Sequence, residues 1–62
     1  MRREFKASLG TLTVGAGEPQ ARAGEVRIEG RAGLFTHAMY ITAEQAREIA
    51  QALIEAAAEA TK

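Results

Sequence analysis

The 62-residue sequence contains no cysteine, no tryptophan and no aspartate. Without cysteine, disulfide bridges and cysteine-ligated metal sites are excluded. The only serine is Ser8 and the only histidine is His37. A Ser-His-Asp triad cannot therefore form within one chain, and a lone histidine supplies too few ligands for zinc. We accordingly expect no enzymatic activity, no metal and no cofactor, and the missing cysteine favours a cytoplasmic location.

Large apolar side chains are also scarce. Hydrophobic residues make up 47% of the chain, but 14 of them are alanines, which bury little area. A domain of this size removes only about 60% of its unfolded surface from water, so its stability is marginal. Small domains without disulfides or metals commonly gain stability by self-association.

No excess of one charge is present, because eight basic residues balance eight glutamates. This balance argues against a strongly basic nucleic-acid binder and against an acidic DNA mimic. The charges are unevenly placed, with +2 in residues 1–41 and −2 in residues 42–62. No apolar run has the length of a membrane span or follows the N-terminal arginines as in a signal peptide, so we expect no membrane partner.

The clearest element that is present is a helix over residues 43–60. Thr42 and Gln45 have the spacing of a capping box, and Glu44 lies in the first turn, where the helix dipole favours negative charge. Apolar residues recur at helical spacing along one stripe, namely Ala46, Ile49, Ala50, Leu53, Ile54, Ala57 and Ala60. The opposite arc is charged and polar.

Strands precede this helix. Residues 25–30 alternate between apolar and charged side chains, which predicts a strand with one face in water. Residues 34–41 carry apolar side chains at both parities, which predicts a central strand. Residues 30–33 (Gly-Arg-Ala-Gly) between them suit a tight hairpin.

Residues 4–14 are also expected to be extended. The apolar parity changes at Gly10, which indicates either a β-bulge or a turn that divides the segment into two short strands. Residues 15–24 contain three glycines and the only proline, and are expected to form a loop. The Gly15-Ala16-Gly17 sequence within it lacks the third glycine and the following helix of a phosphate-binding loop.

These elements predict one α+β domain over residues 1–62, a three-stranded antiparallel meander with the C-terminal helix packed on one face. One helix covers only one face of such a sheet. The two apolar sets of the last strand are Phe35, Met39 and Ile41 on one side and Leu34, Ala38 and Tyr40 on the other. One set would remain exposed, and a two-fold homodimer is the commonest way to cover such a patch.

Several charged and aromatic residues are candidates for partner binding. Arg27 and Arg31 share a strand face with Glu25 and Glu29, which cancels most of their field. Phe5 and Tyr40 have the chemistry to stack on bases, although core packing is the simpler interpretation. The helix glutamates form a solvated face or dock on a basic partner. We single out Arg27, Arg31, Leu34, Tyr40, Glu48 and Glu55 as partner-binding residues.

The segment from Ile41 to Ala57 resembles the closing helix of many short proteins of phages and mobile elements: a strand, a Thr or Ser cap, Glu, then alanine-rich turns. The resemblance covers about a third of the chain. Proteins of this kind include the anti-CRISPR proteins, small inhibitors of bacterial defence. The resemblance implies a non-enzymatic protein-interaction module that acts by steric binding to a host defence complex. The alternative is a nucleic-acid-binding regulator that uses the basic strand face.

Overall fold

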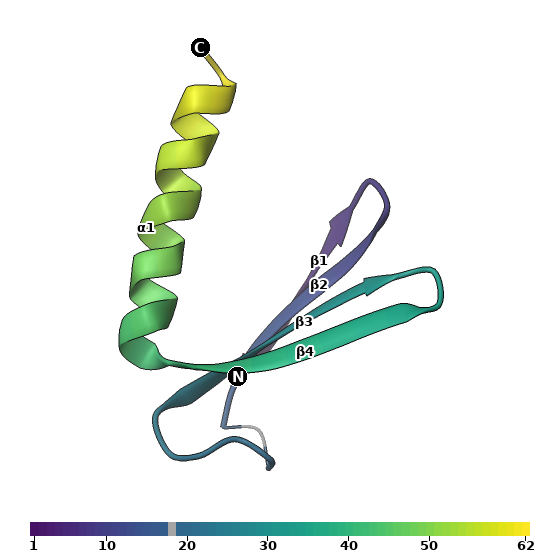
Figure 1. The fold of residues 1–62 in the computed structure, drawn as a ribbon, viewed down its shortest axis with the longest axis vertical. Coiled ribbons are helices and arrows are strands. Elements are labelled where there is room, and N and C mark those ends of the chain that lie inside the picture. The colour runs from purple at the N-terminus through teal and green to yellow at the C-terminus, as the bar shows by residue number, and fades with distance from the viewer. Residues whose placement is uncertain (18) are drawn as a thin grey trace.

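The computed structural model describes residues 1–17 and 19–62, and shows an α+β fold with a four-stranded antiparallel sheet and one C-terminal helix (Figure 1). The elements are β1 (Arg2–Ala7), β2 (Gly10–Ala16), β3 (Glu25–Ala32), β4 (Phe35–Thr42) and α1 (Ala43–Ala60). The strands lie in the order β1-β2-β3-β4, so that every neighbour in the sheet is also a neighbour in the sequence.

The prediction of three strands is wrong, because residues 4–14 form parts of two strands. Ser8 and Leu9 make a two-residue turn, across which Ala7 pairs with Gly10. A turn is therefore confirmed and the β-bulge is wrong, but the turn lies just before the predicted position, because Gly10 is already the first residue of β2. A two-residue hairpin turn explains the change of parity, since it places Phe5 directly opposite Leu12 on one face of the sheet.

The second hairpin joins β3 to β4 through Gly33 and Leu34, slightly beyond the predicted turn at residues 30–33. Gly33 has a φ of 60°, which a glycine adopts without steric cost at the first position of a tight hairpin turn. The expectation that residues 34–41 form the central strand is also wrong. β4 lies at the edge, because β1 and β2 both add to the other side of β3.

The loop between β2 and β3 is shorter than the predicted 15–24, since Gly15 and Ala16 belong to β2. Glu18, within the predicted loop, lies outside the described residues. At the far end of the loop the backbone carbonyl of Gly24 accepts a hydrogen bond of 3.0 Å from Ala43 N. This bond ties the first residue of α1 to the start of β3.

The predicted helix is confirmed at both ends, and so is its capping box. The Thr42 hydroxyl accepts from Gln45 N at 3.1 Å, and the Gln45 side chain accepts from Thr42 N at 3.0 Å. These reciprocal bonds satisfy two backbone donors that a helix start otherwise leaves free. Thr42 is at once the last residue of β4 and the N-cap, so no linker separates strand from helix.

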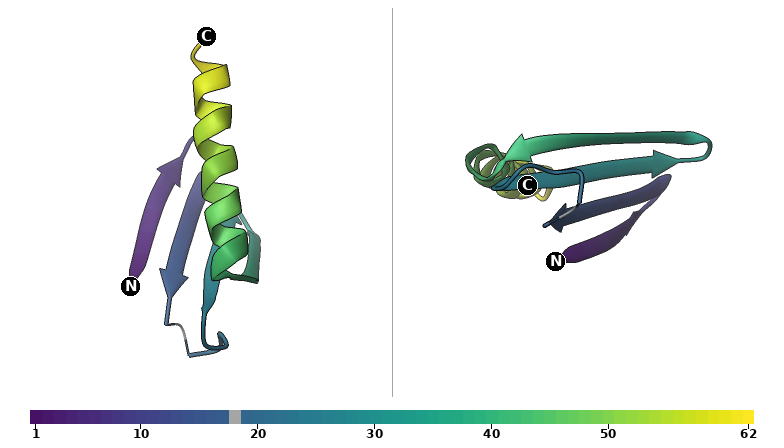
Figure 2. Two further views of the ribbon diagram at one scale, coloured as in Figure 1. Left: turned by 90° about the vertical axis from the view of Figure 1, so that its left-hand side faces the viewer. Right: turned by 90° about the horizontal axis from the view of Figure 1, so that it is seen from below.

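The helix does not lie across the sheet, contrary to the prediction. It rises from the end of β4 and diverges from the strands (Figures 1 and 2), and none of its residues is buried. Leu53, near the middle of the apolar stripe, is 62% exposed. The chain passes from Thr42 to Ala43 without a linker, and in the direction that it takes there α1 contacts only β3 and β4 among the described strands.

The register of the four strands separates an apolar face of the sheet from a polar face. The apolar face carries, strand by strand, Arg3, Phe5 and Ala7; Leu12 and Val14; Val26, Ile28 and Ala32; and Phe35, His37, Met39 and Ile41. The polar face carries Arg2, Glu4 and Lys6; Thr11 and Thr13; Glu25, Arg27, Glu29 and Arg31; and Thr36, Ala38 and Tyr40. The fold thus places nearly all large apolar side chains of the sheet on one side.

Candidate functional site: the groove between the sheet and the helix

An apolar groove of about 410 Å³ lies between the apolar face of the sheet and α1. We call it the sheet–helix groove. Its lining consists of Met1, Arg3, Phe5, Leu12, Val14, Val26 and Ile28 on the sheet side, and Ala46, Ile49, Ala50 and Leu53 on the helix side. Arg3 is the one charged residue in this lining, and its guanidinium lies 5.1 Å from the centre of the Phe5 ring at the rim.

The groove lining stays in contact with solvent in the single chain. No hydrophobic residue among residues 1–17 and 19–62 is buried, and the exposed fractions of Phe5 and Leu12 are 44% and 39%. In a stable domain the largest apolar side chains are those most often removed from water. The side chains that would form a core are therefore gathered together, but no second layer covers them.

The accessible surface and the radius of gyration also indicate that no second layer covers the apolar face. The accessible surface is 5228 Å², whereas a compact monomer of this mass exposes about 3,900 Å². The radius of gyration is 12.7 Å, against about 10.6 Å for a compact domain of this length. The single chain therefore exposes roughly 1,300 Å² more than a compact fold, and a standard interface buries about 800 Å² per partner.

The polar face of the sheet contains the most deeply buried side chains of the described residues, Thr13 and Glu29, which are directly opposite each other on β2 and β3. Arg27 donates to the Glu29 carboxylate at 2.7 Å, and Arg31 lies 3.8 Å from it. The hydrogen bond from Arg27 lowers the pKa of Glu29, against the opposing effect of desolvation. The predicted cancellation of charge on this strand face therefore takes the form of an ion pair between Arg27 and Glu29.

A small cavity of about 250 Å³ lies on this polar face, lined by Arg2, Pro19, Gln20, Arg27 and Tyr40. Arg2, Gly15, Arg27 and Tyr40 form one row across the four strands. The Tyr40 hydroxyl donates to the Gln20 side chain at 3.1 Å, and Arg27 is engaged with Glu29. Tyr40, Gln20 and Arg27 in the lining of this cavity therefore already have hydrogen-bond partners.

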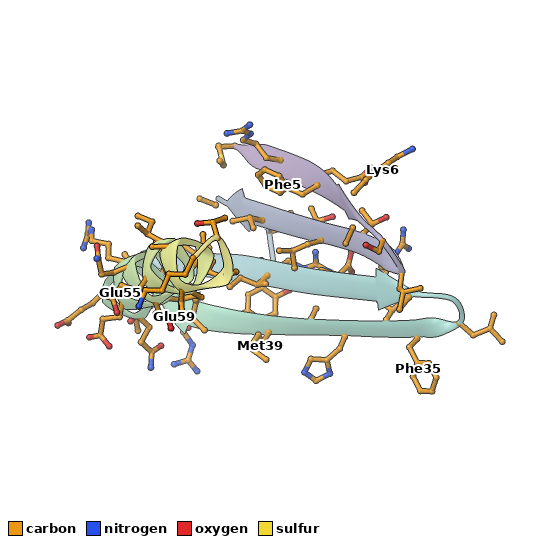
Figure 3. All side chains as sticks on the ribbon, turned by 90° about the horizontal axis from the view of Figure 1, so that it is seen from above. Phe5, Lys6, Phe35, Met39, Glu55 and Glu59 are labelled. Carbon is orange, nitrogen blue, oxygen red and sulfur yellow. The ribbon has the colours of Figure 1, made fainter. Side chains whose placement is uncertain are left out.

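The predicted partner-binding residues fall in three separate places. Arg27, Arg31 and Tyr40 share the polar face, whereas Leu34 is fully exposed at the turn between β3 and β4. Glu48 and Glu55 lie on α1, and Figure 3 shows Glu55 pointing away from the strands. No single surface contains all six. Phe5 and Tyr40 lie on opposite faces, so they cannot form one base-stacking platform.

The groove-lining residues Leu12, Val14, Val26 and Ile28 were not among the predicted partner-binding residues, although their alternation was visible in the sequence. An apolar parity predicts a buried face, and only the direction of α1 shows that this face stays uncovered.

His37 lies on the apolar face of the edge strand β4. Within residues 1–17 and 19–62 no group of three His, Cys, Asp or Glu residues could hold a metal ion.

Comparison of the chain with protein-family models, with curated proteins and with solved structures finds no match. Among the described residues, no helix combines the length and the apolar character that crossing a membrane requires. The functional argument consequently depends on the surfaces of the molecule itself.

The Glu29→Gln substitution should destabilise the protein at neutral pH and have less effect in acid. Glu29 has a folded-state pKa below its ordinary value of 4.5, so its ionised form adds stability above that value, and this contribution is lost as the pH falls through the folded-state pKa. Urea unfolding of both proteins at neutral pH and near pH 3 measures the difference. Glu55→Gln, on the exposed helix arc, is the control, and an equal deficit of Glu29→Gln at both pH values would contradict the assignment.

Proposed function

We propose that this chain is a non-enzymatic protein-interaction module whose first partner is a second copy of itself. The observation that carries the proposal is the uncovered sheet–helix groove in a chain with no buried hydrophobic residue among those described. Exposed apolar patches of this kind mark interaction sites. The excess surface of the single chain, about 1,300 Å², is of the size that a stable homodimer buries.

Sedimentation velocity of the purified chain tests this proposal directly. We expect a homodimer of twice 6.6 kDa at about 100 µM, because two copies related by a two-fold axis can cover each other's exposed grooves. A folded monomer of 6.6 kDa over the whole concentration range would reject the self-associating module.

The wider role that we propose is that of a phage-type inhibitor, which binds a host defence complex sterically. Its support is the resemblance of residues 41–57 to small proteins of mobile elements, together with the surfaces that a dimer leaves free. These surfaces are the Leu34 turn, the Arg31 side of the polar face and the outer arc of α1 with Glu48 and Glu55.

Phage plating tests the inhibitory role. In a bacterial host whose CRISPR–Cas system targets the phage, expression of the chain should restore plaque formation to the level seen without targeting. The double substitution Leu34→Ser and Arg31→Ala should abolish this effect while leaving the dimer intact. Unchanged plating with the parent chain in hosts that carry different CRISPR–Cas types would reject this role but not the dimer.

The second candidate, a nucleic-acid-binding regulator, is weakened by the ion pairs of the polar face. Glu29 engages both Arg27 and Arg31, so few uncompensated cations remain to release counterions from phosphates. We expect no micromolar binding to a mixed-sequence duplex at 150 mM salt in a fluorescence-anisotropy titration. Micromolar binding of a duplex or of a single-stranded oligonucleotide, lost in the Arg27→Ala, Arg31→Ala variant, would favour this candidate instead.

A further inference from the structure

The sheet–helix groove has two walls that meet where α1 begins, the apolar face of the sheet and the inner side of the helix. An occupant that fills it must be apolar toward both walls. An α-helix, about 10 Å across with its side chains, is the secondary-structure element that fills such a space between a sheet and another helix. The chain itself contains one helix, which lines one wall of the groove and leaves the space between itself and the sheet unfilled.

The apolar stripe of α1 is wider than its own groove requires. Ile49 and Leu53 line the groove, but Ile54 does not, and Ile54 is 64% exposed. At 100° per residue, Ile49 and Ile54 point about 140° apart around the helix axis. These two side chains therefore mark the two margins of the stripe, with Ala46, Ala50 and Leu53 between them. The Ile49 margin faces the groove of its own chain, whereas the Ile54 margin is left for a second surface.

We infer that the groove of each chain is filled by α1 of a second copy. The Ile49 and Leu53 side of the inserted helix lies against α1 of the host chain, and the Ile54 side lies against the sheet, near Leu12 and Ile28. The two-fold symmetry makes the helix–helix contact identical from both sides. Ala46 and Ala50 in this contact allow the two helices to approach closely.

The polar arc of α1 agrees with this arrangement. Glu44, Glu48, Gln51, Glu55 and Glu59 all lie on one side of the helix, and the described bonds of this arc are local, from Gln51 to Glu55 at 3.2 Å and from Lys62 to Glu59 at 3.1 Å. Figure 3 shows Glu55, a member of this arc, pointing away from the strands. Insertion of the apolar side into the groove leaves these carboxylates in water. Arg47 points within about 20° of Ile54 around the helix axis, so its long side chain must reach solvent at the rim of the groove.

The inference rests on the proposed homodimer, and chemical cross-linking tests it separately. Since the chain has no cysteine, introduced cysteines are unique. A tagged Leu12→Cys chain is mixed with an untagged Ile54→Cys chain, unfolded and refolded together, and treated with a short bismaleimide. We expect a cross-linked tagged–untagged pair. The control partner Ala52→Cys, on the polar arc of the same helix, should give no such pair.

Glutamate substitutions at positions 54 and 52 test the same arrangement through the dimer dissociation constant, without a cross-linker. Ile54→Glu should raise the dimer dissociation constant by at least about 100-fold, because it places a carboxylate against the sheet of the partner. Ala52→Glu should leave that constant unchanged.

The possible results distinguish helix insertion from the formation of the homodimer. A dimer that forms normally with Ile54→Glu, or that links Leu12→Cys to Ala52→Cys as well as to Ile54→Cys, would overturn helix insertion and leave the homodimer standing. The absence of any dimer would overturn both.

Discussion

Gly10→Ala should cost about 3 kcal/mol of stability, a large share of what a domain of this size possesses. A Cβ atom at Gly10 would lie far inside van der Waals contact with the backbone carbonyl oxygen of Arg31, and close to the backbone of Ala32. Backbone atoms of a neighbouring strand cannot move aside as the end of a side chain can. β2 and β3 would have to separate where the hydrogen-bonded ladder begins.

The matched control is Gly30→Ala on the neighbouring strand. A Cβ atom at Gly30 meets nothing within 4 Å, and its φ is not in the left-handed region. We expect a change below about 1 kcal/mol, in the range of ordinary substitutions. Urea unfolding followed by circular dichroism measures both variants, and equal midpoints for Gly10→Ala and the parent would show that the close approach of β2 to β3 is absent in solution.

Leu53→Ala should destabilise the protein by about 2–5 kcal/mol per chain, the cost of truncating a buried leucine. In the single chain this side chain is 62% exposed, and its removal would have little effect there. We expect the large effect because, in the proposed homodimer, the second copy covers this side chain. The measurement is thermal unfolding of parent and variant at several protein concentrations, since the melting temperature of a folded dimer rises with concentration.

Leu34→Ala is the control for this experiment, because it makes the same chemical change at a fully exposed turn. It should melt within a few degrees of the parent at every concentration. If Leu53→Ala behaves like Leu34→Ala, the helix stripe is not buried in solution and the groove is open. Melting temperatures that do not depend on concentration would lead to the same conclusion.

Together these expectations describe a protein whose folding and assembly are one process. The sheet has no apolar core of its own, since its buried side chains, Thr13 and Glu29, lie on the polar face. In the proposed homodimer, the apolar face and the helix become a core when the second copy covers them. Small domains that lack disulfides and metals reach stability in this way.

Local sequence determined the helix and the approximate position of the hairpin between β3 and β4. Thr42 and Gln45 marked the N-terminus of α1 because a capping box depends only on residues three apart, and both of its hydrogen bonds are present. The alternation in β3 likewise assigned its two faces, since side-chain direction in a strand has a period of two. The change of parity at Gly10 was visible as well, but parity alone fits a bulge and a turn equally well.

The tertiary structure decided which surfaces are covered. Apolar side chains on Leu12, Ile28 and Leu53 predicted a helix packed on its own sheet, whereas α1 leaves the sheet at once because Thr42 ends the strand and caps the helix together. Hydrophobic periodicity indicates that a face avoids water, but the burial energy is the same whichever chain supplies the cover. Only the path of the backbone at Thr42 therefore distinguished a self-contained core from an uncovered groove.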